Sequence, residues 1–256
     1  TADILNRLAD VEMHAIQTSG NCIRNTTTDA YAGAAADELA DPRPVCELIR
    51  QWSSLHPEFT YLPRKFKIAV TGSPHDRAAV RVHDIGLRMH LNDKGERGWE
   101  VLVGGGQGRT PMVAVTVRDW LAEADLLPYL TAVMRVYNLI GRRDNKYKAR
   151  IKILVHEMGA EAFSAAVEKE FAEAPKETIA VDARELARIT SYFAPPAWEN
   201  LAAFVPGIEE KKLADRGFRQ WLAANTAAHK VPGYTSVNAS FKPTGGIPGD
   251  ATSHQM

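Results

Sequence analysis

The chain has 256 residues, 45% hydrophobic and 24% charged, and its 31 acidic and 31 basic side chains give a formal net charge of zero. This composition is typical of a globular protein with one large domain or two small ones, and the neutral balance favours neither a nucleic acid nor a membrane surface as a partner. No apolar run approaches the ~20 residues of a membrane-spanning helix, and two cysteines without C-x-x-C spacing argue against a disulfide framework or a self-contained iron–sulfur site, so a cytoplasmic location is expected.

The first half of the chain predicts helices alternating with strands. Apolar residues at near-helical spacing predict a helix over residues 2–15, and Arg24 and Asn25 follow it in a predicted polar loop. Another helix is expected after Pro44. Strand-like segments separated by turn signals are predicted at residues 66–71, 79–90 and 98–104.

The second half predicts mainly helices. Residues 117–174 read as largely helical with a break at Gly159, and two shorter helices are expected near 182–192 and 209–225. A strand-like stretch follows at 236–241. The mixture predicts an α+β fold with mixed or antiparallel sheets and flanking helices.

The most informative string is Tyr-Leu-Pro-Arg-Lys-Phe-Lys at residues 61–67. In a strand, Lys65 and Lys67 share one face roughly 7 Å apart, and Arg64 lies on the other. Two ammonium groups held side by side repel each other, so an anion between them is a natural interpretation. An ordinary surface strand also carries such pairs, and this alternative stays open.

Two further segments offer groups for an anion. The run Gly104, Gly105, Gly106 lets the backbone approach a ligand closely, and Arg109 follows it; a flexible turn is the alternative, and the spacing is not that of a dinucleotide site. Residues 142–152 hold six cations in eleven positions. This run is consistent with a solvated basic face or with nucleic-acid binding, but net neutrality and the lack of interleaved aromatic residues count against nucleic acid.

Other chemistry finds no support in the residue pattern. His83 and Asp84 are neighbours that point to opposite faces of a strand, no nucleophile pairs with them, and we interpret His83 as structural. The eight histidines show no metal-ligand spacing, so no metal ligands are assigned. Several cation clusters without a triad or metal set imply a polyanionic ligand of fixed geometry.

These residues also carry a family resemblance. Four strings occur in order over nearly the whole chain: NCIRN at 21–25, YLPRKFK at 61–67, VLVGGG at 101–106 and ARIK at 149–152. They resemble the nitrite/sulfite reductase family, most closely its bacterial members. The resemblance implies six-electron reduction of sulfite or nitrite at a sirohaem coupled to a [4Fe–4S] cluster, with a ferredoxin or a flavoprotein reductase as electron donor.

The resemblance also assigns residues. By position, Arg24, Lys65 and Lys67 match the family residues that bind the anion above the iron, so they are the expected catalytic residues. Arg150 is expected to contact a macrocycle carboxylate, with Lys152 as the alternative. The full set implied to bind cofactor or anion is Arg24, Asn25, Arg64, Lys65, Lys67, Gly104, Gly105, Gly106, Arg109 and Arg150.

The chain also departs from the family pattern. The family holds its cluster with C-x5-C and C-x3-C motifs, which this sequence lacks, and Cys22 and Cys46 do not match ligand positions. We therefore expect a fragment that is inactive alone. The expected organisation is the tail of a first ferredoxin-like half-module at 1–20, a sirohaem reductase domain at 21–190, a helical linker at 191–230 and the start of a second half-module at 231–256.

The leading hypothesis is part of an assimilatory sulfite or nitrite reductase. The alternatives are a non-catalytic anion- or tetrapyrrole-binding module and a nucleic-acid-binding domain built on residues 142–152; neither nucleic acid nor a membrane is an expected partner. The choice between sulfite and nitrite, the electron donor and the oligomeric state are left open by the sequence.

Overall fold

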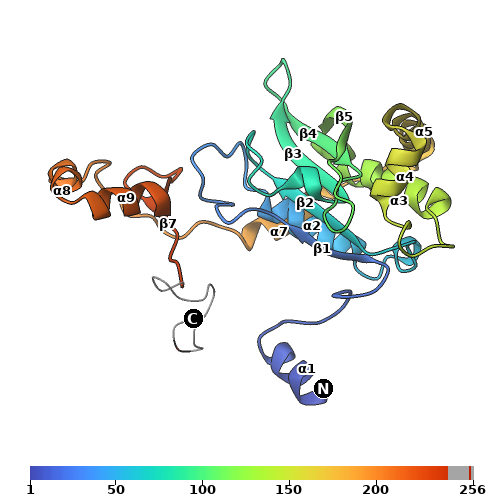
Figure 1. The fold of residues 1–256 in the computed structure, drawn as a ribbon, viewed down its shortest axis with the longest axis horizontal. Coiled ribbons are helices and arrows are strands. Elements are labelled where there is room, and N and C mark those ends of the chain that lie inside the picture. The colour runs from blue at the N-terminus through green and yellow to red at the C-terminus, as the bar shows by residue number, and fades with distance from the viewer. Residues whose placement is uncertain (242–253, 255–256) are drawn as a thin grey trace. The chain divides into compact units, whose positions relative to one another are not determined.

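The computed structural model describes residues 1–241 and 254, with only the backbone at 177–178. The chain divides into two compact units (Figure 1): residues 1–33 with 38–194, and residues 34–37 with the segment that starts at 195. Most of the second half-module expected at 231–256 lies outside the described residues, since positions 242–253 and 255–256 are not described.

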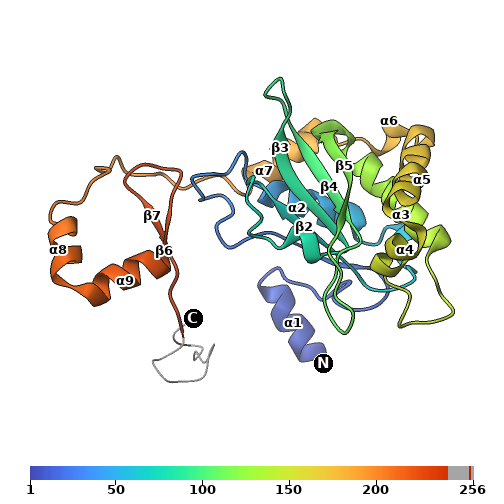
Figure 2. The same ribbon diagram turned by 45° about the horizontal axis from the view of Figure 1, so that its top comes forward.

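A five-stranded mixed sheet organises the first unit (Figures 1 and 2). Its spatial order is the chain order, with β1, β2 and β3 parallel and β3, β4 and β5 antiparallel. The strands are β1 (Ile23–Thr27), β2 (Phe66–Thr71), β3 (Ile85–Leu91), β4 (Arg97–Val103) and β5 (Val115–Ala122). The α+β class predicted from the sequence is confirmed.

Helices bury one face of this sheet. Apolar side chains of the sheet form a single cluster with side chains from five helices. These helices are α2 (Arg43–Ser53), α3 (Leu126–Ile140), α4 (Ile151–Met158), α5 (Ala160–Glu173) and α7 (Ala183–Ser191). Helix α3 is buried over most of its length because it packs between the sheet and α5, which explains its nearly continuous apolar sequence.

Short elements connect and extend this layer. The opposite face of the sheet is partly covered near η2 (Val80–Val82), where Val80 packs with Ala69 and Leu102. The remaining short elements of this unit are α1 (Ala2–Asp10), η1 (Pro57–Phe59), η3 (Glu123–Asp125) and α6 (Lys176–Ile179). Helix α1 buries none of its residues, so its amphipathic pattern finds no packing partner among the described residues.

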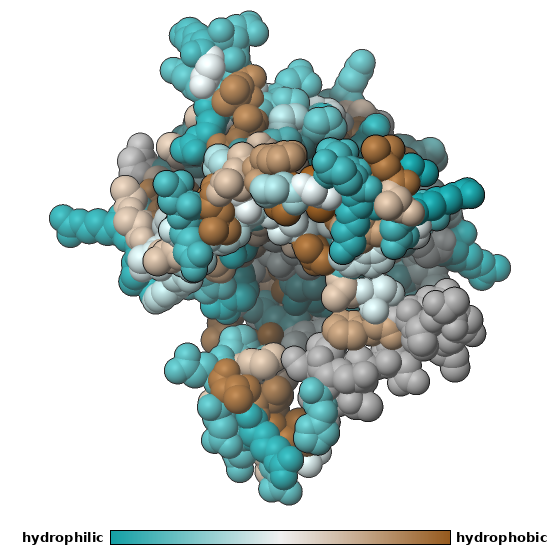
Figure 3. Space-filling view, turned by 90° about the vertical axis from the view of Figure 1, so that its left-hand side faces the viewer, coloured by the Kyte–Doolittle hydropathy of each residue, from teal (hydrophilic) through white to brown (hydrophobic). Residues whose placement is uncertain are grey.

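The second unit is smaller and less buried. It contains α8 (Ile208–Ala214), α9 (Arg216–Asn225), β6 (Thr226–Ala228) and β7 (Thr235–Val237), the strands forming an antiparallel pair. Figure 3, viewed from the left-hand side of Figure 1, shows apolar side chains in brown among polar ones in teal. In the part of the chain that is described, no helix combines the length and apolar character needed to cross a membrane.

Three sequence predictions about local structure are wrong. Arg24 and Asn25 lie in strand β1 rather than in a polar loop, because Ile23 is buried and the segment pairs with β2. The strand predicted from residue 79 begins only at β3, after the turn of η2. The helix predicted from residue 117 is preceded by strand β5, which pairs with β4 and buries Val117 and Leu121. The break at Gly159, between α4 and α5, is confirmed.

Phe66 provides a test of this core. Its side chain is fully buried at the start of β2, with its ring 5.4 Å from that of Tyr137. Phe66→Ala should lower the free energy of unfolding by about 3–5 kcal/mol, since it removes a large apolar group and leaves a cavity. Leu91→Ala, at the exposed end of β3, is the control and should cost less than about 1 kcal/mol. Urea denaturation measures both, and similar losses would contradict this account of the core.

Candidate functional site

A buried carboxylate organises the start of β2 and β3. Asp84 is 1% exposed, and its Oδ2 accepts a hydrogen bond of 2.9 Å from the backbone N–H of Lys67. Its Oδ1 accepts two bonds from the Arg150 guanidinium, from Nε at 2.9 Å and from Nη2 at 2.6 Å. Burial raises the pKa of Asp84, while Arg150 and the Lys67 N–H act in the opposite direction. Asp84 therefore joins β2, at Lys67, to Arg150, the residue before α4.

The glycine run packs against the same residues. The N–H of Gly104 donates to the backbone oxygen of Asp84 at 3.0 Å. A Cβ on Gly105 would lie 2.6 Å from the backbone oxygen of His83, and a Cβ on Gly106 would lie 3.0 Å from Cδ of Lys152. Gly104 also has a φ of +90°, which glycine adopts readily. Close packing thus accounts for Gly104 and Gly105, whatever ligand the site takes, while Gly106 meets only side-chain atoms.

Lys152 closes the loop that follows the glycines. Its side chain is 7% exposed, and Nζ donates to the backbone oxygens of Gln107 at 3.0 Å and Thr110 at 2.5 Å. Burial, followed by the charge of Arg150, lowers the pKa of Lys152. Two carbonyl partners on one ammonium hold the loop that carries Arg109 against α4.

Tyr137 of α3 holds the backbone that leads into α4. Its hydroxyl donates to the backbone oxygen of Ala149 at 2.8 Å. Burial raises the pKa of Tyr137 well above its usual range, so the phenol keeps its proton. One residue of α3 therefore fixes the backbone immediately before Arg150.

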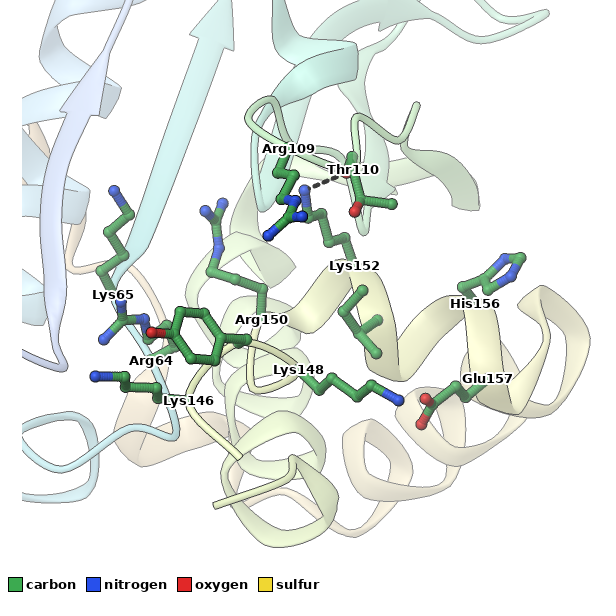
Figure 4. Close-up of a pocket in the computed structure, with 12 residues that line it drawn as sticks. Arg64, Lys65, Arg109, Thr110, Lys146, Lys148, Arg150, Lys152, His156 and Glu157 are labelled. Carbon is green, nitrogen blue, oxygen red and sulfur yellow. Dashed lines mark hydrogen bonds between the residues drawn. The ribbon is translucent and has the colours of Figure 1, made fainter. Parts of the chain in front are cut away.

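Two adjoining cavities border the residues that make these contacts. The wider one, of about 500 Å³, is lined by twelve residues, of which seven are Lys or Arg and one, Glu157, is acidic. Its basic residues, drawn in Figure 4, are Arg64, Lys65, Arg109, Lys146, Lys148, Arg150 and Lys152. The smaller cavity, of about 330 Å³, is lined by Lys65, Lys67, Val82, His83, Asp84, Gln107, Gly108 and Arg150. Lys65 and Arg150 line both.

The cations converge strongly enough to perturb one another. Burial lowers the pKa of Lys65, and the charges of Arg150, Arg24, Lys67 and Arg64 lower it further. In Figure 4, Arg109, Arg150 and Lys152 enter the same space from the glycine loop and from the start of α4, while Lys65 approaches from the β2 side. Uncompensated positive charge of this kind favours an anion in the cavities.

The sequence-predicted residues are not all in the same place. Lys65 and Lys67 line the smaller cavity together, as their spacing predicts. Arg64, expected on the opposite face, lines the wider cavity with Lys65, because β2 begins only at Phe66. Gly106 lies beside Arg150 and Lys152, and Arg109 lines the wider cavity.

Arg24 and Asn25 lie on the neighbouring strand. Asn25 pairs with Lys67 between β1 and β2. Nε of Arg24 donates to the backbone oxygen of Gly20 at 2.9 Å, and its charge acts on Lys65. Neither residue is among those that line the two cavities. Their part in anion binding stays a prediction.

Sequence reasoning missed some contributors and misplaced others. Lys146 and Lys148 line the wider cavity, and the density of cations in residues 142–152 was the available signal. Residues 141–150 form no helix, since α3 ends at Ile140 and α4 begins at Ile151. Arg143 instead donates to the backbone oxygens of Tyr61 and Asn138, so it fixes a loop. Asp84 was missed because its partners are distant in the sequence.

The expected cofactors fit these residues only in part. A sirohaem carries carboxylates, and the cations of the wider cavity suit them chemically. A [4Fe–4S] cluster requires thiolates, but the sequence holds two cysteines. Burial raises the pKa of Cys22 and raises that of Cys46 to about 12, which disfavours both thiolates. Among the described residues, no group of three or more His, Cys, Asp or Glu side chains is arranged to hold a metal ion.

Comparison with known proteins gives a consistent result. The family model described as "Nitrite and sulphite reductase 4Fe-4S domain" matches residues 19–175. The chain is 33% identical over 172 residues to a chloroplastic ferredoxin–nitrite reductase of Arabidopsis thaliana, covering 65% of this chain and 29% of that protein. It is 31% identical over 169 residues to a sulfite reductase [ferredoxin] 1 of Mycolicibacterium paratuberculosis, covering 66% and 30%.

A solved structure shares the fold. The NirA protein of Mycobacterium tuberculosis matches with a TM-score of 0.62 and 30% identity, over 68% of this chain and 32% of that one. The chain thus spans about a third of the length of these similar proteins.

The Asp84–Arg150 pair generates a pH-dependent prediction. Arg150→Met leaves Asp84 buried without its cation and should lower the free energy of unfolding by about 3 kcal/mol at pH 7. Loss of Arg150 raises the folded-state pKa of Asp84 further. A carboxyl with a higher pKa in the folded than in the unfolded protein destabilises the fold when ionised, so the deficit should be small below about pH 4 and grow as the pH rises.

Urea denaturation at a series of pH values measures this deficit. Arg142→Met is the matched control, because Arg142 pairs with the exposed Asp144 at the surface, and it should leave the midpoint unchanged. A deficit for Arg150→Met that stays constant from pH 4 to pH 8 would contradict a charged, buried Asp84.

Proposed function

Because the chain belongs to the nitrite and sulphite reductase family, we propose that it forms the anion-binding part of an enzyme that reduces sulfite or nitrite by six electrons. The observation that carries this proposal is the pair of adjoining cationic cavities that share Lys65 and Arg150. A large polyanion and a small one can occupy neighbouring spaces with the same cations between them. The ferredoxin named for both curated relatives is the proposed electron donor, and the proposed location is the cytoplasm.

In this proposal the wider cavity receives the carboxylates of a sirohaem. Arg64, Arg109 and Arg150 line it with guanidinium groups, whose planar forks match carboxylates in two parallel hydrogen bonds. Arg150 is already oriented by Asp84, and the loop carrying Arg109 is already held by Lys152. Preorganised cations lose little conformational freedom on binding, which favours affinity.

The smaller cavity receives the substrate anion. Lys67 lines it from β2 and Lys65 from the residue just before that strand, and the backbone of Lys67 is anchored to Asp84. Their ammonium groups would stabilise the bound oxyanion and the negative charge added during reduction. An anion would also offset the mutual repulsion that lowers the pKa of Lys65. Arg24, whose charge acts on Lys65 from β1, is proposed to contribute to the same field.

When bound, the sirohaem with its coupled iron–sulfur cluster supplies the electron transfer that these side chains cannot. The residues that fit it here are the cations of the wider cavity, and the thiolates for the cluster are not among the 256 residues. This absence favours a second candidate for the 256 residues taken alone, namely a non-catalytic anion- or tetrapyrrole-binding module.

Absorption spectroscopy separates the two candidates. The protein is produced with ample sirohaem, both as these 256 residues and as the full reading frame that encodes them. The proposal expects sirohaem and cluster bands in the latter, together with sulfite- or nitrite-dependent oxidation of reduced ferredoxin. Sirohaem without a cluster or turnover would favour the binding module, and absence of sirohaem from both would contradict the proposed function.

Substitutions in the two cavities should have different effects. In the holoenzyme, Lys65→Met or Lys67→Met should lower turnover by at least about a hundredfold while sirohaem content stays near one per chain, since the cation acts on the substrate. Arg64→Ala should instead reduce sirohaem occupancy, measured by absorbance. Lys94→Met, in the exposed turn between β3 and β4, is the control and should change neither. Near-normal turnover of both lysine variants would exclude their anion role.

A further inference from the structure

His83 occupies a defined place in the smaller cavity. It lies between η2 and β3 and lines this cavity with Lys65 and Lys67. The sequence suggested a structural histidine, because no nucleophile pairs with it. Its position beside the two lysines instead places an imidazole at the space proposed for the substrate anion.

A backbone contact determines which ring nitrogen of His83 carries the proton. Nδ1 lies 2.8 Å from the backbone oxygen of Ala79. A carbonyl oxygen only accepts hydrogen bonds, so Nδ1 must be the donor. In the neutral ring this leaves Nε2 as an acceptor, and in the protonated ring Nε2 carries a second proton that it can donate. Because this contact occupies Nδ1, Nε2 is the ring nitrogen that is left to exchange a proton.

The backbone near His83 is constrained by Ala79 on one side and by Gly105 on the other. Ala79, which supplies the accepting oxygen, has φ +55° and ψ +40°, a left-handed conformation that is uncommon for a residue with a side chain. Its oxygen also accepts from the N–H of Val82 at 3.1 Å. On the other side, Gly105 packs so closely on the backbone oxygen of His83 that a Cβ there would lie 2.6 Å away. Strained backbone kept in place at a cavity is a known mark of functional sites.

The other charged groups that line this cavity differ from His83 in their chemistry. Lys65, Lys67 and Arg150 are the cations proposed to hold the anions. Asp84 is 1% exposed, and both its oxygens already accept hydrogen bonds from Arg150 and Lys67. Among the described residues that line it, His83 alone carries an imidazole, a group that can both accept and donate a proton.

We propose that His83 is a proton donor to the anion bound between Lys65 and Lys67, an inference that rests on the proposed function. Reduction of nitrite to ammonium and two waters consumes six electrons and eight protons, as does reduction of sulfite to hydrogen sulfide and three waters. The electrons come from the one-electron protein donor. His83 transfers the Nε2 proton to a substrate oxygen and regains a proton from solvent at the same nitrogen. Two such transfers let that oxygen leave as water as its bond to nitrogen or sulfur breaks, with the electrons drawn from the donor.

The test uses the holoenzyme with His83→Asn. An asparagine amide N–H replaces the Nδ1–H donor to Ala79 but removes the exchangeable nitrogen, so the fold is preserved. We expect kcat to fall by about a hundredfold at pH 7.5, with KM for the anion changed less than threefold. The deficit should shrink as the pH falls, because solvent then supplies protons more readily, and the solvent deuterium isotope effect should rise. His14→Gln, an exposed histidine remote in sequence from both cavities, is the control and should change neither.

A second measurement is independent of turnover. In the 256-residue chain labelled with ¹⁵N-histidine, the signals lost in His83→Asn identify His83. We expect Nδ1 to carry a proton in every state of the ring, because it donates to Ala79, and addition of sulfite should shift the Nε2 signal. A ring whose single proton is at Nε2, or no shift on sulfite addition, would overturn the placement of His83 beside the anion. His83→Gln provides a second variant if the asparagine protein has a lowered unfolding midpoint.

The outcomes distinguish this inference from the function on which it rests. If the wild-type holoenzyme reduces neither anion, the proposed function fails and the proton role fails with it. If the wild type is active and both His83 variants keep more than half its kcat from pH 6 to pH 9, the inference on His83 fails and the function stands. A large rise in KM at unchanged kcat would assign His83 to anion binding and likewise overturn proton donation.

Discussion

The carboxylate of Asp84 is the contact on which the rest of the site depends. It lies out of water, so it is stable there only with charged and hydrogen-bonding partners, and it takes them from two distant segments. Arg150 supplies the charge and the N–H of Lys67 supplies the remaining bond. The backbone oxygen of Asp84 also accepts a hydrogen bond from the N–H of Gly104. Asp84 therefore brings together three segments: β2 at Lys67, the glycine run at Gly104 and the residue before α4.

The arrangement gathers positive charge instead of neutralising it. Asp84 compensates one guanidinium. Among the described residues that line the two cavities, Glu157 is the only other acidic one. The lowered pKa of Lys65 reflects that imbalance, after burial. Such a site is costly without a ligand and becomes favourable when anions enter it. Members of the family to which the chain belongs reduce small oxyanions. Such a reaction places an anion among the cations and consumes protons as oxygen is removed.

The sequence predicted much of the fold from local patterns. Strands β2 and β4 and helix α2 were predicted within a few residues because their apolar spacing and turn residues are clear. Strand β5 was missed because Arg118, Asp119 and Trp120 interrupt its alternation, and its pairing with β4 is a non-local contact. Strand β1 was taken for a loop because its polar residues show nothing of the parallel pairing with β2 that orders them.

For the site, the chemical character and the family resemblance follow from the amino-acid sequence, through the string at 61–67, the glycine run and the cations up to Lys152. Which of these groups meet depends on the tertiary structure. Asp84 and Arg150 are 66 positions apart, and nothing in either neighbourhood indicates the pair. His83 likewise gains its place in the smaller cavity from the turn at Ala79 and from Gly105 behind it. Charge and residue type are local properties, whereas desolvation and convergence arise only when distant segments pack together.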